Sequence, residues 1–347
     1  MTILPPSLVR WQAATDTATL EQTRHTEGRG VELAAGAATG TITSPRLPAD
    51  WQQAVPSWQA DAPRGTAVEV LLRAEIAGRW TRWYNLGRWS TDASLRHSVD
   101  DQDDADARVA TDTLELRHAA QALQWRVVLH GAADCSPALR GIGIALGPVP
   151  EADADESAGG GIAPLPVPEL SQMVYPNGGN VWCSPTSLTM LLGYWYARTN
   201  DPRLAPFADP QSVPEIVAPA VYDSVYDGTG NWPFNTAFAA TLGLEGYVLQ
   251  LRGLDDVRQL LQAGVPLAIS IRWRIGELPG APVGHSNGHL IVVVGLTDSG
   301  DLIVNDPAAD PRKGTQVRRI YPQAPLRQAW AQSGRTAYLV FPPGWLA

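Results

Sequence analysis

Apolar and polar residues alternate with a period of two through much of the first half of the chain. The alternation is clearest over residues 68–73, 125–130 and 142–146, and Gly, Pro and Asp residues separate these segments. A period of two turns one side of an extended segment to the core and the other to solvent, which is typical of half-buried strands. We therefore predict that residues 1–148 form an all-β domain, a sandwich of the jelly-roll type.

The second half begins with a helical pattern instead. Leu188, Leu191, Leu192 and Trp195 follow the spacing i, i+3, i+4, i+7 and predict a helix over residues 184–197. The same reasoning predicts helices over residues 234–242 and 254–263, and strands over residues 247–251, 266–273, 289–296, 302–305 and 338–341. A leading helix followed by strands is an α+β order, which we assign to residues 169–347.

A segment without apolar periodicity separates the two halves. Residues 148–169 are rich in Pro, Gly, Ala and acidic residues and include three consecutive glycines at positions 159–161. This composition is typical of an interdomain linker, which we predict over residues 149–168. A chain of 347 residues is long for one hydrophobic core, so two domains are expected on length alone.

Charge and hydropathy limit the classes of partner and the location that we expect for the protein. The chain has 26 Lys and Arg against 35 Asp and Glu, a formal charge of −9, which argues against nucleic acid or an anionic membrane. No apolar run reaches the roughly 20 residues that span a bilayer, and the N-terminal residues lack the pattern of an export signal. We expect a soluble monomer, cytoplasmic by default and secreted if the start of the chain is incomplete.

Cys183 is the first residue in the chain that suggests chemistry. It follows a glycine-containing loop and precedes Pro185, which a helix tolerates only in its first turn. At a helix N-terminus the free N–H groups and the dipole stabilise a thiolate and lower the pKa of the thiol. A buried structural cysteine explains this residue equally well when it is taken alone. The only other cysteine, Cys135, lies in the other predicted domain, so we expect no disulfide framework.

A thiolate nucleophile needs a base, and the second half has two histidines. His289 begins an apolar run through Leu296 that predicts a central strand. His285 lies in a glycine-containing segment that predicts a loop. We favour His289, because a strand fixes the position of an imidazole better than a loop does.

The chain then reverses and supplies a partner for the imidazole. A turn over residues 297–301 predicts an antiparallel hairpin whose second strand returns toward His289 and ends at Asn305 and Asp306. A carboxylate there would accept the second imidazole N–H and stabilise the imidazolium. A slip of one residue in register decides which of the two side chains faces His289. A turn residue before Pro307 is the alternative interpretation of Asp306, and we favour the partner of the imidazole.

These segments together resemble a known family. A Cys at a helix start, Gly288-His289-Leu290 before an apolar strand, and Asn305-Asp306-Pro307 occur in the order found in the C39-like branch of the papain-like cysteine peptidases. The resemblance extends over residues 170–341. It implies a papain-like α+β fold, with Cys183 as nucleophile, His289 as base and Asp306 as the residue that orients the base.

The same resemblance implies a glutamine that lines the oxyanion hole. Gln172 corresponds to it, although it lies eleven residues before Cys183, farther than is usual for these enzymes. Asn177, six residues before Cys183, is the alternative donor. The chain lacks a phosphate-binding loop motif and a membrane segment, so we expect a stand-alone relative rather than a peptidase fused to an exporter.

Aromatic residues are candidates for the walls of the cleft. Trp182 precedes the nucleophile, and the polar, glycine-containing segment 222–232 contains Tyr226 and Trp232. Packing in the core is an equally good interpretation of these side chains.

The first half offers two weaker signals. Seven of the thirteen tryptophans lie there and suggest either core packing or a platform for sugar rings. The acidic segment 100–106 suggests either a solvated loop or calcium ligands, and we favour the loop because the spaced Gly and terminal Glu of a known calcium loop are absent.

The sequence therefore predicts a cysteine peptidase or amidase that acts on a peptide or cell-wall substrate through a thioester, without metal or other cofactor. Two alternatives stay open. One is a catalytically silent binding protein that has kept the fold, and the other is an acyltransferase, similar to transglutaminases, that uses the same three residues.

Overall fold

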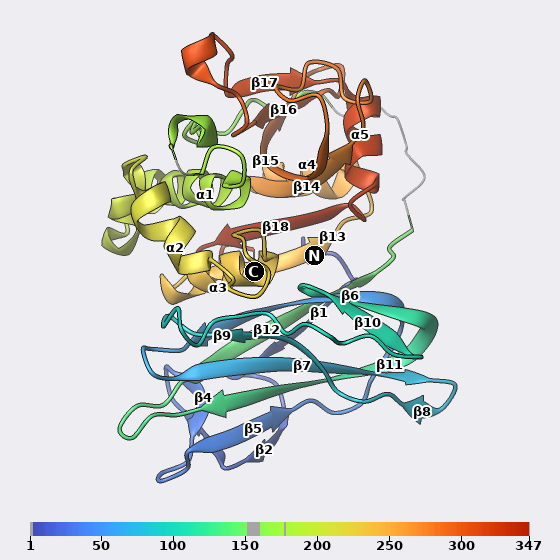
Figure 1. Cartoon of the computed structure of the whole chain (residues 1–347), viewed down its shortest axis with the longest axis vertical. Coiled ribbons are helices and arrows are strands. Elements are labelled where there is room, and N and C mark those ends of the chain that lie inside the picture. The colour runs from blue at the N-terminus through green and yellow to red at the C-terminus, as the bar shows by residue number, and fades with distance from the viewer. Residues whose placement is uncertain (1–2, 151–159, 177, 347) are drawn as a thin grey trace.

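The computed structural model describes residues 3–150, 160–176 and 178–346. These residues form two domains that are stacked along the long axis of the molecule (Figure 1). The N-terminal domain is mostly β, and the C-terminal domain combines helices with a second sheet. The two-domain organisation that the sequence predicts is confirmed.

The described residues of the N-terminal domain form twelve strands. They are β1 (Leu8–Gln12), β2 (Thr19–Glu21), β3 (Thr23–Thr26), β4 (Gly30–Leu33), β5 (Thr39–Thr43), β6 (Leu47–Asp61), β7 (Ala67–Ile76), β8 (Arg79–Trp80), β9 (Tyr84–Trp89), β10 (Ala107–Ala110), β11 (Thr113–His130) and β12 (Ala138–Gly147). The three alternating segments of the sequence lie in β7, β11 and β12. Their apolar positions, such as Val70, Trp125 and Ile144, are buried in the domain core.

All twelve strands belong to one hydrogen-bonded network, because the long strands β6 and β11 pair with different neighbours along their lengths. Register shifts within the β11–β6 ladder bend these strands, as β-bulges do. A sandwich would divide its strands between two packed sheets. The first half is thus confirmed as mostly β, with a barrel-like sheet that is not clearly the predicted sandwich.

The C-terminal domain contains a six-stranded antiparallel sheet in the order β13-β18-β14-β15-β16-β17. Its strands are β13 (Glu245–Gln250), β14 (Leu267–Trp273), β15 (Ser286–Leu296), β16 (Leu302–Asn305), β17 (Arg318–Tyr321) and β18 (Thr336–Phe341). Its α-helices are α1 (Cys183–Thr199), α2 (Ala218–Val221), α3 (Trp232–Thr241), α4 (Leu254–Gln262) and α5 (Gln323–Ala331), with short turns of other helix types over residues 172–174, 202–208, 213–217 and 311–313.

Most of these elements follow the sequence pattern, and three do not, namely α2, β17 and α5. β17 is a short strand at the edge of the sheet with two arginines, so it lacks an apolar period. α5 contains Pro325 and has no side-chain cap at its start. Elements without their usual local signals form here because tertiary packing supplies the stabilisation.

Helix α1, which begins at Cys183, is packed against the sheet of this domain. All residues from Ser184 to Trp195 are buried, those of the predicted apolar face and the rest alike. This is expected for a helix that is surrounded by protein. Ser187 donates a hydrogen bond through Oγ to the Leu290 carbonyl oxygen of β15 at 3.3 Å. The Tyr338 hydroxyl of β18 donates to the Ser184 carbonyl oxygen at 3.1 Å. The start of α1 is therefore fixed against the centre of the sheet.

The predicted linker is only partly described, because residues 151–159 lie outside the described residues. Its last part, residues 160–168, runs along β15. Ile162 exchanges backbone hydrogen bonds with Leu296, and the N–H of Leu165 donates to the Val294 carbonyl oxygen. Contacts of the C-terminal domain therefore begin before residue 169, where the sequence pattern placed its start.

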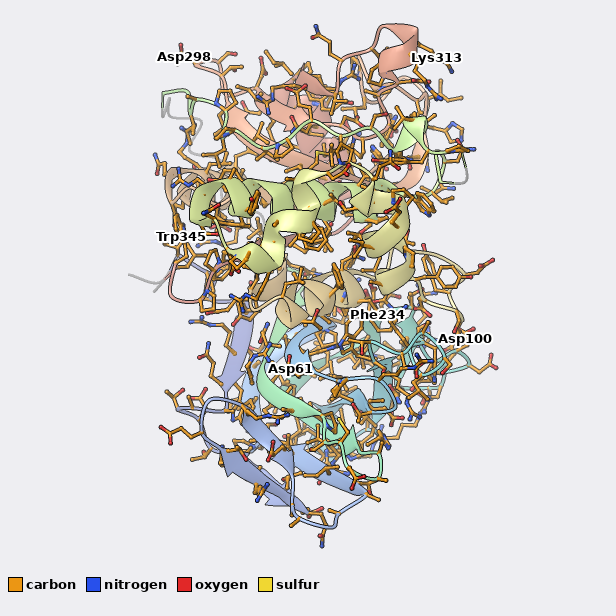
Figure 2. All side chains as sticks on the ribbon, turned by 90° about the vertical axis from the view of Figure 1, so that its left-hand side faces the viewer. Asp61, Asp100, Phe234, Asp298, Lys313 and Trp345 are labelled. Carbon is orange, nitrogen blue, oxygen red and sulfur yellow. The ribbon has the colours of Figure 1, made fainter. Side chains whose placement is uncertain are left out.

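An apolar contact joins the two domains. Phe234 of α3 packs against Trp58 and Trp89 of the N-terminal sheet, with ring centroids 6.2 and 5.6 Å apart. Phe234 lies at the boundary between the domains in Figure 2. A Cβ atom at Gly143 would lie 2.6 Å from the Tyr247 ring, so glycine is needed there for the sheets to approach. The domains are thus packed together rather than merely tethered.

Candidate active site

Cys183 is the first residue of α1, as the sequence predicts. The preceding residue, Trp182, occupies the cap position without a capping hydrogen bond from its side chain. Cys183 is half-buried, whereas the exposed Cys135 lies far along the chain in the other domain. The Cys183 thiol therefore lies at the positive end of a helix dipole, in the position that stabilises a thiolate.

His289 lies on β15 beside the start of α1. It pairs with Ile271 of β14 and is only 5% exposed. The ring of Trp273 meets the imidazole edge-on, with centroids 5.9 Å apart. His285 lies in the exposed loop before β15. The structure thus puts the imidazole that the sequence favours on a rigid strand and against an aromatic ring.

Asp306, and not Asn305, faces the imidazole. His289 Nε2 and Asp306 Oδ1 are 2.8 Å apart, and the Asp306 side chain is fully buried. Asn305 turns the other way and donates from Nδ2 to the Pro168 carbonyl oxygen at 3.0 Å. The β15–β16 ladder has a register shift between Val293 and Gly295, and this irregularity decides which neighbour points to His289.

Further hydrogen bonds hold the carboxylate in place. The hydroxyl of Tyr321, on β17, donates to Asp306 Oδ2 at 2.6 Å, and the N–H of Ala308 donates to Oδ1 at 2.9 Å. Sequence reasoning missed Tyr321 and Trp273 as members of the site. A tyrosine on an edge strand has no local signal, because its partner is reached only through the pairing of β16 with β17.

The electrostatics of the three side chains are coupled. Burial raises the pKa of the Cys183 thiol, but the hydrogen bond and charge of His289, together with the N–H groups of Leu290 and Ser184, outweigh it and lower that pKa. Burial lowers the pKa of His289, but the Asp306 carboxylate and the hydrogen bond with Cys183 raise it well above its ordinary value. Burial raises the pKa of Asp306, but His289 and Tyr321 lower it overall.

These shifts favour a thiolate beside an imidazolium whose other nitrogen is held by a carboxylate. Since Nε2 is bound to Asp306, Nδ1 is the ring nitrogen left to exchange a proton with the thiol. This arrangement can deliver an activated sulfur nucleophile together with a proton donor.

Gln172 connects the loop that leads to Cys183 with the segment that follows Asp306. Its backbone N–H donates to the Pro307 carbonyl oxygen at 2.9 Å, next to Asp306. Its Nε2 donates to the Gly179 carbonyl oxygen at 2.9 Å, in the loop that leads to Cys183. An amide nitrogen has two N–H groups, so one donor remains after this bond. The alternative residue, Asn177, lies outside the described residues.

The three aromatic candidates have different surroundings. Trp182 is half-buried and packs against Tyr175, with ring centroids 6.1 Å apart. Tyr226 is exposed in the loop before α3, and burial of its hydroxyl and the negative charges of Asp112 and the Cys183 thiolate raise its pKa. Trp232 begins α3 and packs partly against the core, and its backbone N–H donates to Asp112 Oδ2 at 2.9 Å.

The tryptophans of the N-terminal domain are mostly core residues. Five of the seven are buried, namely Trp11, Trp51, Trp58, Trp89 and Trp125. Trp80 and Trp83 are partly exposed, and the Arg73 guanidinium lies 4.6 and 4.5 Å from their ring centroids. Arginine thus covers the two rings that remain near the surface, which leaves the sugar platform a prediction.

The acidic segment 100–106 is held by arginines. Asp106 pairs with Arg79 at 2.6 Å, and Asp104 pairs with Arg82 at 2.6 Å. In the part of the chain that the structure describes, no group of three or more His, Cys, Asp or Glu side chains is arranged to hold a metal ion. None of the described helices is both long enough and apolar enough to cross a membrane.

Each half of the chain matches the model of a known protein family. Residues 7–147 match the model of the peptidase C39 N-terminal domain, and residues 164–338 match the model of the peptidase C39-like family. No curated protein sequence matches the chain.

Solved structures give weaker likenesses. A protein from Bacillus anthracis, described as a C39-like peptidase, is 18% identical, with a TM-score of 0.36, over 52% of this chain and 97% of that one. The xylan-binding module CBM15 is 10% identical, with a TM-score of 0.24, over 40% of this chain and 95% of that one. A family 6 carbohydrate-binding module is 10% identical, with a TM-score of 0.21, over 40% and 94%. These scores are too low to support an argument about this chain.

Proposed function

The chain belongs to the peptidase C39-like family, and from that premise we propose that it is a cysteine peptidase or amidase that cleaves a peptide or amide bond through a thioester. The observation that supports this most is the continuous chain of contacts from the Cys183 thiol through His289 to Asp306 Oδ1. We further propose that the C-terminal domain is of the papain-like α+β class, since the thiol is on a helix start and the imidazole on the sheet.

In the proposed reaction the Cys183 thiolate attacks the carbonyl carbon of the substrate amide. The His289 imidazolium gives its proton to the leaving nitrogen, so an amine departs and a thioester remains. His289, now neutral, takes a proton from water as the oxygen attacks the thioester. A carboxylic acid leaves, and the thiolate–imidazolium pair is restored. Asp306 orients the imidazole and stabilises its positive charge in both steps.

The developing negative charge on the carbonyl oxygen needs donors. The backbone N–H of Cys183 and the amide of Gln172 are the proposed pair. The position of Gln172 supports this role, because its hydrogen bonds join the loop before Cys183 to the residue after Asp306. Proline at position 185 leaves the first turn of α1 with one N–H fewer, which makes the side-chain donor more important.

The domain division that we propose follows the sequence pattern, with a β domain in residues 1–148, a connection over 149–168 and a catalytic domain over 169–347. The last residues of the connection pack along β15. A peptide or a cell-wall polymer is the proposed substrate class. Glycan binding by the first domain rests only on the partly exposed Trp80 and Trp83.

A labelling experiment separates an enzyme from a silent binding protein. In a Cys135→Ser background, iodoacetamide has one thiol to alkylate. We expect Cys183 to react well below about pH 8, because the thiolate is the reactive form and its pKa is lowered. The matched variant His289→Ala should move the midpoint of reactivity to higher pH. Reactivity that begins only near the pH of an ordinary thiol, in both proteins, would contradict an activated nucleophile.

Product analysis separates hydrolysis from acyl transfer. The protein is incubated with a pool of synthetic peptides, with and without an added primary amine, and the products are identified by mass spectrometry. The proposal predicts free carboxylic acids in both reactions. Amine adducts that replace the acids would favour the acyltransferase, which uses the same thioester.

A further inference from the structure

Exposed apolar side chains gather in the loops around Cys183. In the segment that precedes Cys183, Val174 and Val181 are 39% and 62% exposed. In the loop between α2 and α3, Tyr222, Val225 and Tyr226 are 39%, 40% and 49% exposed. Single apolar residues on a surface are normal, but a group beside a reactive thiol is typical of a binding surface.

The two loops are connected next to the thiol. The hydroxyl of Thr229 donates to the carbonyl oxygen of Val181 at 3.3 Å, two residues before Cys183. Gly230 lies against the Tyr226 ring, since a Cβ atom there would lie 3.3 Å from the Tyr226 hydroxyl oxygen. The loop over residues 222–231, which we call the wall loop, therefore lies beside the start of α1.

A buried arginine of the N-terminal domain supplies the first attachment of the wall loop. Arg96 is only 2% exposed. Its Nε donates to the Tyr222 carbonyl oxygen at 2.9 Å, and its Nη2 donates to the Pro219 carbonyl oxygen at 2.7 Å. Its Nη1 donates to Ser90 in its own domain at 3.1 Å. One guanidinium thus bridges the domains and satisfies two carbonyl oxygens at the end of α2.

A fully buried carboxylate supplies the second attachment. Asp223 accepts hydrogen bonds through Oδ1 from the backbone N–H of Ser98, at 2.9 Å, and from the Ser98 hydroxyl, at 3.2 Å. The same oxygen accepts from the N–H groups of Val225 and Tyr226 at 3.1 and 3.3 Å, and Oδ2 accepts from Asn231 Nδ2 at 2.9 Å. The group that shapes the wall loop is therefore the group that fixes it to the other domain.

Asp112 supplies the third attachment. It lies in the turn between β10 and β11, and its Oδ2 accepts from the N–H of Trp232, where the wall loop enters α3. Arg96, Ser98 and Asp112 all come from the N-terminal domain, more than 100 residues before the residues that they contact. The other domain thus holds the wall loop at its first two residues and at the point where it enters α3.

We propose that the N-terminal domain completes the substrate cleft by fixing the wall loop beside Cys183, and that Val225 and Tyr226 of this loop bind an apolar side chain of the peptide next to the scissile bond. That the substrate is a peptide rests on the proposed function. The preference of the wall loop for an apolar group does not, and it can be tested without peptide cleavage. This gives the first domain a role in positioning the substrate that needs no glycan.

The test uses alkylating probes that carry an amino acid. Iodoacetyl-leucinamide and iodoacetyl-aspartamide, a Leu and an Asp derivative of iodoacetamide, are compared in the Cys135→Ser background at about pH 9, where even an ordinary thiol is partly ionised. The rates are divided by the rate with iodoacetamide itself. We expect the Leu probe to react about tenfold faster than the Asp probe, the scale of discrimination that an apolar pocket gives.

Two variants weaken the wall in different ways. Arg96→Met removes one of the three attachments, the one at the start of the wall loop. Tyr226→Ser removes an exposed ring of the wall and leaves all three attachments in place. Arg96→Met should lower the Leu-to-Asp ratio, and Tyr226→Ser should bring it close to one. Each rate is divided by the rate of iodoacetamide in the same variant, so a change in the thiol itself cancels. The matched control is Arg140→Met, because Arg140 also crosses the domain contact and donates to a carbonyl oxygen, that of Ala240, at the far end of α3. This variant should keep the ratio of the parent protein.

A ratio near one in the parent protein would overturn the proposal, and so would an unchanged ratio in Tyr226→Ser, which does not depend on the folding of an interface variant. Failure of the proposed function is visible separately. In that case the pH dependence of plain iodoacetamide is ordinary, and peptides stay intact, whatever the ratio of the two probes is.

Discussion

Two buried carboxyl groups, Asp306 in the candidate site and Asp112 at the contact between the domains, have opposite surroundings. Burial raises the pKa of both. At Asp306 the His289 imidazolium and Tyr321 outweigh burial, and the pKa falls below its ordinary value. At Asp112 the hydrogen bonds from Trp232 and Thr113 do not outweigh burial, and the pKa rises to about 6. In this pair of residues, the neighbouring imidazolium is what separates the carboxyl with the lowered pKa from the carboxyl with the raised pKa.

The candidate site stabilises ionised side chains, whereas the contact between the domains holds backbone segments in place. The candidate site holds a thiol, an imidazole and a carboxylate whose pKa values are shifted toward their ionised forms. The domain contact uses Asp112 and Asp223 as acceptors for N–H and O–H groups that no strand or helix partner satisfies. Substitutions in the first region should therefore change chemistry, and substitutions in the second should change placement and stability.

The largest effect is expected at the thiol. Cys183→Ala removes the nucleophile and should lower kcat by about 10⁶-fold, the scale seen when a covalent nucleophile is removed. The measurement is the rate of cleavage of the best peptide from the pool, and Cys135→Ala is the control that should keep full activity. Cleavage by Cys183→Ala at the parent rate would show that Cys183 is not the nucleophile.

The next effect should be at the carboxylate that orients the base. Asp306→Asn keeps the shape of the side chain but removes its charge, so we expect kcat to fall by up to about 10⁴-fold. The pKa of His289 should fall, because the Asp306 charge holds it up. NMR titration of the imidazole measures that shift. Asn305→Ala is the matched neighbour, and it should lower stability through its lost bond to Pro168 while kcat is retained.

A smaller effect is expected at Gln172. Gln172→Ala should lower kcat by on the order of 10²–10³, as for the loss of one oxyanion donor, with little change in KM. Gln172→Glu is a useful companion, because it keeps the size of the side chain and replaces the donor with an acceptor. A carboxylate cannot donate to an oxyanion, so full activity in the Glu variant would contradict the role of Gln172 as an oxyanion donor.

The smallest effect on activity is expected at Asp112, where stability should change with pH. Because the folded-state pKa is raised to about 6, the native state binds more protons than the unfolded state between about pH 4 and 6. The free energy of unfolding should therefore fall as pH rises through this range, by on the order of 3 kcal/mol from this group. Urea unfolding at several pH values measures it. Asp112→Asn should remove this component and flatten the profile; an unchanged profile would show that Asp112 is not its source.

Local patterns in the sequence determined most elements of the fold and two members of the site. The period of two along β7 and the helical period of α1 correctly predicted which side chains are buried, because each element must cover an apolar face. Cys183 was placed at a helix start by Pro185 and the loop before it, and His289 was placed on a strand by the apolar run that follows. These are statements about neighbours in the chain.

Tertiary structure decided everything that depends on which strands pair and how. The register shift in the β15–β16 ladder selected Asp306 over Asn305, and the pairing of β16 with β17 brought Tyr321 to the carboxylate. The burial of five tryptophans and the attachment of the wall loop by Arg96 and Ser98 likewise depend on contacts between distant residues. No local period encodes such contacts, since they form only when two separately specified surfaces meet.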